Sequence, residues 1–220
     1  MATWIVTGAN RGIGLELCRQ LIARREDVIA ACRTRSEDLA ALGATIATGV
    51  DITTTAAHEP ILAALAGRKI DVLVHNAGIL VPDALESFDP ESIRRQFEVN
   101  ALGPLRLTRA LLGKLGKGSK VGLVSSRAGS IADNKSGGLY GYRMSKAALN
   151  MAATSLARDL ASRGIAVVVL HPGYIKTAMT GFSGNDEPPV AAKGLLKHLD
   201  ELTVETSARF LHANGEELPW

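Results

Sequence analysis

The chain alternates between short apolar runs and longer segments in which apolar residues recur every three or four positions. The short runs have the length of buried β-strands, and the longer segments have the period of helices with one apolar face. The runs that predict strands are Thr3–Thr7, Asp27–Cys32, Ala44–Val50, Asp71–His75, Lys120–Ser125, Ile165–His171 and a last one near Arg209–Leu211. The segments that predict helices are Gly12–Arg24, Ser36–Leu42, Thr54–Ala66, Asp89–Leu115, Tyr142–Arg163 and Val190–Leu202.

Strict alternation of strand and helix predicts an α/β fold, because crossover connections place helices on both faces of a parallel sheet. Pro60 is expected to kink or delay the helix in which it lies. The 220 residues suffice for one well-buried core and are too few for two ordinary domains. No repeat or linker divides the chain. We therefore expect a single doubly wound domain over residues 1–220, with a seven-stranded, mostly parallel sheet.

Composition and charge remove several classes of function. The net charge of +3 comes without a long basic run, so no nucleic-acid partner is expected. No charged segment precedes an apolar stretch at the start, and no apolar run approaches the length of a membrane span, so neither a signal peptide nor a membrane span is expected. Cys18 and Cys32 lack metal-ligand spacing. A reduced, cytoplasmic setting without a metal site is the simplest interpretation.

A glycine-rich turn follows the first expected strand and opens the first expected helix. It reads Thr7-Gly-Ala-Asn-Arg-Gly-Ile-Gly14. Gly8 can make the tight turn, Gly12 lets the backbone approach a pyrophosphate, and Gly14 allows close packing of helix on strand. The amide groups of the helix N-terminus then face the phosphates. This turn predicts a dinucleotide site.

The end of the second expected strand predicts which dinucleotide is preferred. NAD enzymes usually carry a carboxylate there for the ribose hydroxyls. This chain has instead Cys32-Arg-Thr-Arg35. Arg33, together with Arg11 of the glycine turn, can pair with a 2′-phosphate through planar guanidinium groups, whereas Arg35 reads as ordinary surface charge. We expect NADP(H) to be preferred, with NAD(H) possible.

Tyr142 and Lys146 stand four residues apart, which places both on one face of a helix. A nearby ammonium group lowers the pKa of a phenol, and a phenol tuned in this way can exchange a proton with a carbonyl oxygen. Two irregular segments, Ser126–Gly141 and Thr180–Pro189, follow strand ends, where ligands bind in parallel sheets. The second of these reads as a mobile loop.

The chain resembles the short-chain dehydrogenase/reductase family over essentially its whole length. The residues that carry the resemblance are the glycine turn, Asp51-Ile52, His75-Asn76-Ala77-Gly78, Asn100, Ser126, the Tyr142/Lys146 pair and Pro172-Gly173-Tyr-Ile-Lys-Thr177. More narrowly, Ser125–Asn134 and Leu218–Trp220 resemble the C-factor/sniffer-like carbonyl reductase branch. The resemblance implies a Rossmann fold and an NAD(P)-dependent oxidoreductase that transfers hydride between nicotinamide and a small carbonyl or alcohol substrate.

The resemblance also implies roles for individual residues. Tyr142 would be the general acid/base, Lys146 would tune it and bind the nicotinamide ribose, Ser126 would orient the carbonyl, and Asn100 would hold a relay water. The implied cofactor-binding residues are Gly8, Asn10, Arg11, Gly12, Ile13, Gly14, Arg33, Asp51, Ile52, Asn76, Ala77, Gly78, Tyr142, Lys146, Pro172, Gly173, Ile175 and Thr177.

Alternatives remain for four of these assignments. Tyr140 competes with Tyr142, although Met144, four residues after it, cannot act as its ammonium partner. Ser125 competes with Ser126, which fits the family pattern Ser-x-x-Gly. Asn100 could stabilise a helix kink. Asp51 could cap the segment that follows it.

The chain departs from the family pattern in three places. His75 replaces the usual first Asn of its motif, so the hydrogen bonds there are expected to differ. The spacing from Ser126 to Tyr142 is longer than is common, which predicts a longer loop beside the substrate. The segment after Thr177 is short. A shallow, open substrate site without a large lid, and broad specificity, are therefore expected.

Two other functions compete with carbonyl reduction. A dinucleotide-binding signalling or sensor protein of C-factor type would keep the fold with little turnover, and a lipid-associated protein would need a basic amphipathic helix that the sequence lacks. The segments Ala101–Leu115 and Tyr142–Ser162 carry more apolar positions than one sheet face requires: Leu102, Leu105, Leu149, Met151 and Leu156. A homodimer or homotetramer is expected on that basis.

Overall fold

The computed structural model describes residues 1–220 and contains one sheet of seven strands. In chain order the strands are β1 (Thr3–Thr7), β2 (Asp27–Ala31), β3 (Thr45–Ala47), β4 (Val72–His75), β5 (Lys120–Val124), β6 (Ala166–His171) and β7 (Phe210–His212). Their spatial order is β3-β2-β1-β4-β5-β6-β7, and every pairing is parallel. The predicted single α/β domain with a mostly parallel sheet is thus confirmed, and the sheet is parallel throughout.

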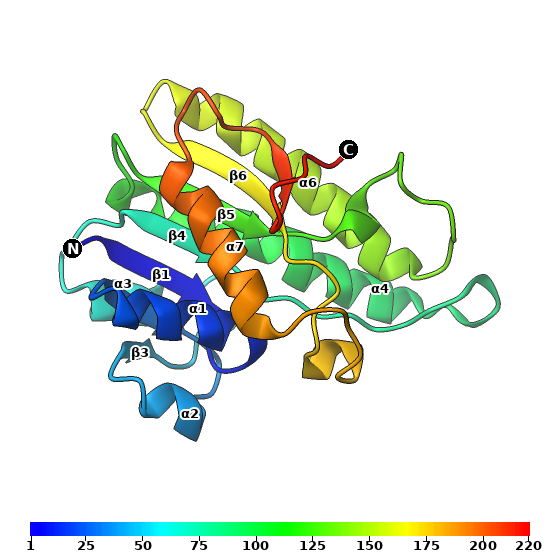
Figure 1. The fold of residues 1–220 in the computed structure, drawn as a ribbon, viewed down its shortest axis with the longest axis horizontal. Coiled ribbons are helices and arrows are strands. Elements are labelled where there is room, and N and C mark those ends of the chain that lie inside the picture. The colour runs from blue at the N-terminus through cyan, green and yellow to red at the C-terminus, as the bar shows by residue number, and fades with distance from the viewer.

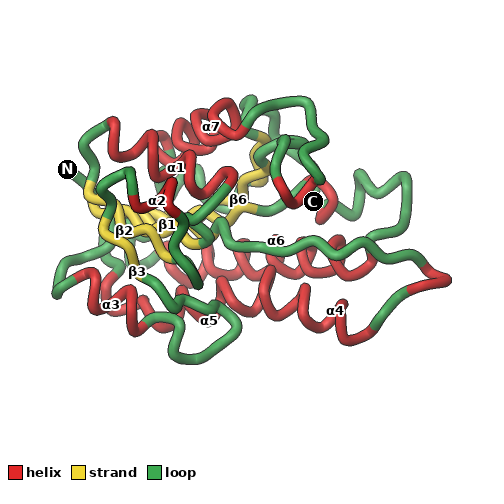
Figure 2. Tube along the Cα trace, turned by 90° about the horizontal axis from the view of Figure 1, so that it is seen from below, coloured by secondary structure: helices red, strands yellow, loops and turns green.

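Helices cover both faces of this sheet. They are α1 (Gly12–Ala23), α2 (Glu37–Ala40), α3 (Glu59–Leu65), α4 (Pro90–Phe97), α5 (Gly103–Leu111), α6 (Tyr140–Ala161) and α7 (Pro188–Glu201). Figure 2 shows α1 and α7 on one face and α3, α5 and α6 on the other. Each face has its own apolar core, and neighbouring residues of one strand, such as Ile5 and Val6, contribute to opposite cores. None of the helices has the length and apolar character that a membrane crossing requires.

Most predicted elements are present with shifted ends. The run Ala44–Val50 forms a strand only over Thr45–Ala47, because Gly49 turns the chain at a φ of +76°. The segment Thr54–Ala66 becomes helical only at Glu59, with Pro60 in its first turn. Proline favours this position because the first turn of a helix has no use for its missing N–H.

The prediction of one continuous helix over Asp89–Leu115 was wrong. A π-helical turn, Glu98–Leu102, separates α4 from α5, and the Gly103 amide donates to the Glu98 carbonyl. Pro104 has no N–H to donate to the carbonyl of Asn100, which lies four residues before it, so the α-helical pattern fails at this point.

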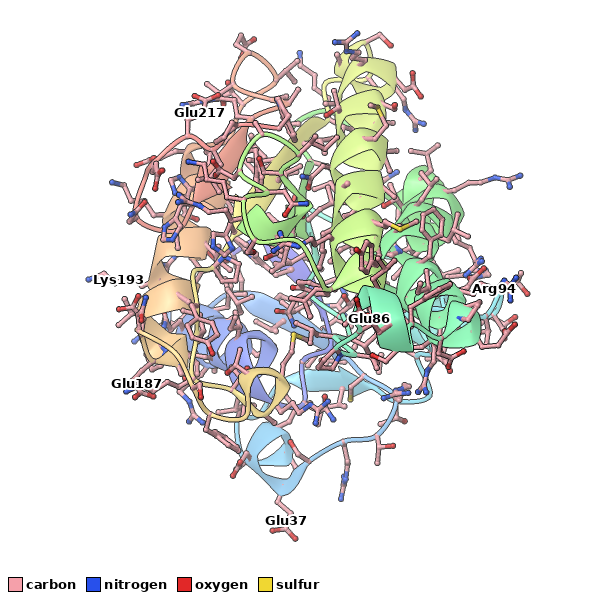
Figure 3. The ribbon with its side chains drawn as sticks, turned by 90° about the vertical axis from the view of Figure 1, so that its right-hand side faces the viewer. Glu37, Glu86, Arg94, Glu187, Lys193 and Glu217 are labelled. Atoms are coloured by element: carbon pink, nitrogen blue, oxygen red, sulfur yellow. The ribbon has the colours of Figure 1, made fainter.

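The parallel strands all end at one edge of the sheet, and Figure 1 shows their arrowheads directed to the same side. Figure 3 views this edge with Glu187 and Lys193 of the α7 region on one side and Arg94 of α4 on the other. Any ligand bound at this edge would lie between those two groups of elements.

Candidate active site

A cavity of about 1000 Å³ lies at the carboxyl edge of the sheet. It brings together most of the residues that the sequence predicted for a cofactor: Gly8, Asn10, Arg11, Gly12, Ile13, Arg33, Asp51, Ile52, Asn76, Ala77, Gly78, Tyr142, Lys146, Pro172 and Thr177. The other predicted residues do not line it: Gly14, Asn100, Ser126, Gly173 and Ile175. These five contact the lining or stand next to it in the chain.

The glycine turn fits closely under the end of β4. Gly8 has a φ of +66°, and a β-carbon on it would lie 2.9 Å from the Ala77 Cα atom. A β-carbon on Gly14 would overlap the Gly8 carbonyl oxygen and lie 2.5 Å from Asn76 Nδ2. Gly14 is therefore a packing residue beneath the turn, which explains its absence from the cavity lining.

The first turn of α1 has donor groups available for an anion. Its N-cap residue, Arg11, makes no side-chain hydrogen bond to the helix. The amides of a first helical turn lack partners within the helix, and their dipoles favour negative charge. This cradle and its glycines fit the pyrophosphate of a dinucleotide.

Thr7 connects the ends of β1 and β4, and the sequence analysis missed it as a site residue. Its hydroxyl oxygen accepts from the Asn76 amide at 3.0 Å and from the Ala77 amide at 3.1 Å. The Asn76 side chain donates to the carbonyls of Thr7 and Gly8 at 3.0 and 3.2 Å. The feature of the sequence that could have indicated Thr7 is its hydroxyl group on the last residue of an apolar strand.

Charged groups gather where the segments that follow β2 and β3 line the cavity. The Asp51 carboxylate accepts from the Thr53 amide at 3.0 Å and the Thr53 hydroxyl at 2.8 Å, and these bonds hold its pKa below the ordinary value. The guanidinium groups of Arg33 and Arg95 lower the same pKa further. Asp51 thus closes a local turn and does not cap α3, whose N-cap is His58. No local pattern of residues indicates Arg95, because its place depends on how α4 packs.

Tyr142 lies near Ser126, just beyond the end of β5. Burial raises the pKa of Tyr142, and the nearby Ser126 side chain lowers it by less. The Lys146 ammonium donates to the Val124 carbonyl at 2.9 Å and lies 5.8 Å from the centroid of the Tyr142 ring. Burial lowers the pKa of Lys146 to about 8. The expected lowering of the phenol pKa by Lys146 is absent here, because burial dominates.

The rival residues occupy different surroundings. Tyr140 is 38% exposed, at the outer start of α6. Ser125 lines the cavity, but its hydroxyl donates to Asn150 Oδ1 at 2.6 Å. The structure therefore brings Ser126, and not Ser125, to the hydroxyl of Tyr142.

Asn100 is fully buried in the π-helical turn. Its side-chain amide donates to the Ile79 carbonyl at 2.8 Å and to the Ser145 hydroxyl at 3.0 Å, and its Oδ1 accepts from the Ile79 amide at 2.8 Å. A β-carbon on Gly78 would lie 3.2 Å from Asn100 Oδ1 and 3.6 Å from Lys146 Nζ. Asn100 and Lys146 thus approach each other across Gly78. The kink-stabilising interpretation of Asn100 fits these bonds.

His75 lies apart from the cavity. Because the Thr108 hydroxyl donates to the Pro104 carbonyl, the His75 Nε2–H group is the donor in its 2.8 Å bond to that hydroxyl. Burial lowers the pKa of His75 to about 3. The departure from the family motif at His75 therefore affects contacts with α5 and not the cavity wall.

Only part of the Pro172–Thr177 motif reaches the cavity. Gly173 has a φ of +100° and packs against His212, and the Ile175 side chain is buried. A β-carbon on Gly12 would lie 3.4 Å from Thr177, so Thr177 contacts the glycine turn.

The wall on the α7 side contains residues that the sequence analysis missed. Lys176, Met179 and Phe182 all line the cavity, and Phe182 is 72% exposed. Lys176 also pairs with Glu187 at 2.8 Å. Exposed apolar residues in a polar, turn-rich segment were the available signal for this wall.

Comparisons with known proteins identify relatives of the chain. The family model described as short chain dehydrogenase matches residues 2–188. A 1-hydroxy-2-glutathionyl-2-methyl-3-butene dehydrogenase of Rhodococcus sp. (strain AD45) is 47% identical over 226 residues, with 100% of each chain covered. C-signal of Myxococcus xanthus is 46% identical over 154 residues, which cover 69% of this chain and 93% of that protein.

Among solved structures, the NADPH-bound carbonyl reductase from chicken fatty liver superimposes with a TM-score of 0.91. Its sequence identity is 29%, and the match covers 100% of this chain and 99% of the other. The likeness therefore extends over the complete fold described above.

Proposed function

Because the chain belongs to the short-chain dehydrogenase/reductase family and is an oxidoreductase of that family, we propose that it is an NADP(H)-dependent enzyme acting on a carbonyl/alcohol pair. The observation that carries this proposal is a single cavity lined both by Tyr142 and Lys146 and by Arg11 and Arg33. The chemistry that the dinucleotide supplies when bound is hydride transfer.

Tyr142 and Ser126 would act together on the carbonyl oxygen. Reduction builds negative charge on that oxygen, and two hydroxyl donors stabilise it. Tyr142, whose pKa burial raises, carries its proton at neutral pH and can therefore donate it to the carbonyl oxygen. In the oxidation direction the phenolate oxygen of Tyr142 would take the proton back from the alcohol.

Lys146 and Asn100 would support the proton transfer. Burial lowers the pKa of Lys146 to about 8, so its ammonium group can release and regain a proton near neutral pH. Both amide hydrogens of Asn100 are already used by Ile79 and Ser145. The relay water would therefore bind the Asn100 backbone carbonyl, which has no α-helical donor because residue 104 is proline.

The proposed NADP(H) preference rests on Arg11 and Arg33, which both line the cavity. The NADPH-bound carbonyl reductase to which this chain is similar supports the same choice. Arg33→Ala should raise the KM for NADPH about tenfold or more through loss of a charge-assisted contact, with little change for NADH. Arg35→Ala is the matched control and should leave both constants unchanged. A wild-type kcat/KM that is higher with NADH would overturn the preference.

The substrate is proposed to be a small carbonyl or alcohol compound bound at the open side of Tyr142. NADPH oxidation should be measured with a panel of aldehydes, ketones and quinones. NADP⁺ reduction should be measured with a hydroxyl-bearing glutathione conjugate, the class named for the Rhodococcus relative. Turnover of at least one compound is expected. Tight NADPH binding without any turnover would instead favour the dinucleotide-sensing alternative.

Two further expectations remain proposals. A homodimer or homotetramer is supported by three exposed residues: Leu102 directly before α5, Leu105 on α5 and Met151 on α6. A cytoplasmic location is supported by the two free cysteines.

A further inference from the structure

The helix that carries Tyr142 begins in an unusual way. Leu139, directly before α6, has a φ of +51°, and no side chain of its own segment caps the helix. A branched residue in the left-handed region is strained, and such strain persists only where surrounding contacts hold it. The strained residue lies three positions before Tyr142, so the contacts that hold it also bear on the position of the phenol.

Those contacts come from Asp83, which is distant in the sequence. Its carboxylate accepts from the amides of Tyr140 and Gly141, the latter at 2.8 Å, and its backbone carbonyl accepts from the Leu139 amide at 3.0 Å. A carboxylate at a helix N-terminus also interacts favourably with the helix dipole. Figure 3 shows the turn marked by Glu86, close to Asp83 in the sequence, against this end of α6.

Two side-chain amides hold the segment that leads to Asp83. Asn100 bonds to both the amide and the carbonyl of Ile79. Gln96 does the same for Val81: its Oε1 accepts from the Val81 amide at 3.0 Å, and its Nε2 donates to the Val81 carbonyl at 3.2 Å. These paired bonds, which we call the amide ladder, replace the neighbouring strand that an extended segment otherwise needs.

The amide ladder and the Asp83 cap meet at Gly141. A β-carbon there would lie 2.5 Å from Gln96 Nε2 and 3.1 Å from Asp83 Oδ2. Gln96 is completely buried. The approach of these two groups to the start of α6 is therefore fixed by close packing as well as by hydrogen bonds.

We propose that Asp83, in the segment that Gln96 holds at Val81, is a positioning residue that sets the start of α6 and thereby the place of the Tyr142 hydroxyl. This inference rests on the proposed function of Tyr142 as the proton donor. The ladder also reaches Asn100, which faces Lys146 across Gly78. One set of bonds thus connects the surroundings of Lys146 with the start of the helix that carries both groups.

The first measurement separates positioning from binding. Asp83→Ala should lower kcat about tenfold or more while the Kd for NADPH changes less than about twofold, because small misplacements of a reacting group act on the chemical step. Asp83→Asn should recover only part of kcat, since its single amide oxygen can accept from one of the two amides while its NH2 group cannot accept from the other. Asp89→Ala is the matched control: it removes the aspartate that caps α4 and should leave kcat unchanged.

The second measurement does not depend on turnover. Hydrogen exchange at the amides of Tyr140 and Gly141 should be faster in Asp83→Ala than in the wild type. In Asp83→Asn it should be slower than in Asp83→Ala. Unchanged kcat despite faster exchange would overturn the positioning role, as would an equal loss of kcat and NADPH affinity in both variants. If the wild type reduces no carbonyl, the proposed function is wrong, while hydrogen exchange still decides whether Asp83 fixes the start of α6.

Discussion

At the scale of single residues, Tyr142 is the group on which the proposed chemistry depends. Tyr142→Phe should reduce carbonyl turnover by about 10² to 10⁴, the usual contribution of a positioned general acid, while NADPH binding stays nearly intact. Steady-state kinetics and fluorescence titration with NADPH check the two parts. Tyr140→Phe removes a hydroxyl two positions earlier on the exposed side and should retain full activity. Equal losses in the two variants would contradict the assignment.

His75 should make the folded chain sensitive to acid. Its folded pKa of about 3 lies below the ordinary value of 6.5, so between these values the unfolded chain binds a proton that the folded chain does not. The contribution of neutral His75 to the free energy of unfolding is therefore complete above pH 6.5. It falls with acidification by about 1.4 kcal/mol per pH unit. His171, whose pKa burial also lowers to about 3, adds to the slope.

Urea unfolding at several pH values between 3 and 6.5 checks the role of His75. His75→Asn should make the dependence on pH shallower by about 1.4 kcal/mol per unit. Thr108→Val removes the hydrogen-bond partner but keeps the histidine, and should retain the steep dependence. An unchanged slope in His75→Asn would show that other groups cause the acid sensitivity.

At the scale of elements, the junction of β1 and α1 depends on the absence of a side chain at Gly14. In Gly14→Ala the new β-carbon meets the Gly8 carbonyl, so the glycine turn has to shift. We expect a loss of about 1 to 3 kcal/mol in the free energy of unfolding. The Kd for NADPH should rise about tenfold or more, an equilibrium change of about 1.4 kcal/mol.

Gly113→Ala is the control for this substitution, because no heavy atom lies within 4 Å of a β-carbon there. Thermal unfolding and fluorescence titration with NADPH should find it close to the wild type in both properties. Unchanged NADPH affinity in Gly14→Ala would mean that the turn does not need this close packing.

The elements also show what the sequence can predict. The strands and the glycine turn follow from apolar runs and glycine spacing, which are local properties. The break at Glu98–Leu102 was missed although Pro104 was visible, since a proline alone does not say whether a helix ends, kinks or takes a π turn. The pairing of Asp83 with the start of α6 joins residues far apart in the chain, so no local pattern indicates it.

At the scale of the whole molecule, the outer surface of the helices carries apolar residues without partners. Leu105 is 37% and Met151 68% exposed, whereas Leu149, also predicted for an interface, is buried in the core of its own chain. The surface expectation was therefore wrong for Leu149, and Leu156 is partly buried against the same core.

The exposed pair leads to a prediction about assembly. Light scattering should give the wild type the mass of two or four 23.2 kDa chains. The double variant Leu105→Glu, Met151→Glu should dissociate, because assembly would bury unpaired carboxylates in an apolar contact between subunits. A wild-type mass equal to one chain would contradict the expected oligomer.

The central position of β1 also bears on how the chain folds during synthesis. β1 can pair with β2 as soon as α1 and β2 have been made, but its other neighbour is β4, which emerges much later. Pairings between distant segments slow folding, and domains left incomplete on the ribosome expose their strand edges. The glycine turn is thus made first, yet its contacts with Asn76 and Ala77 form only after β4 has joined the sheet. A nascent chain therefore acquires dinucleotide affinity late, when the centre of its sheet closes.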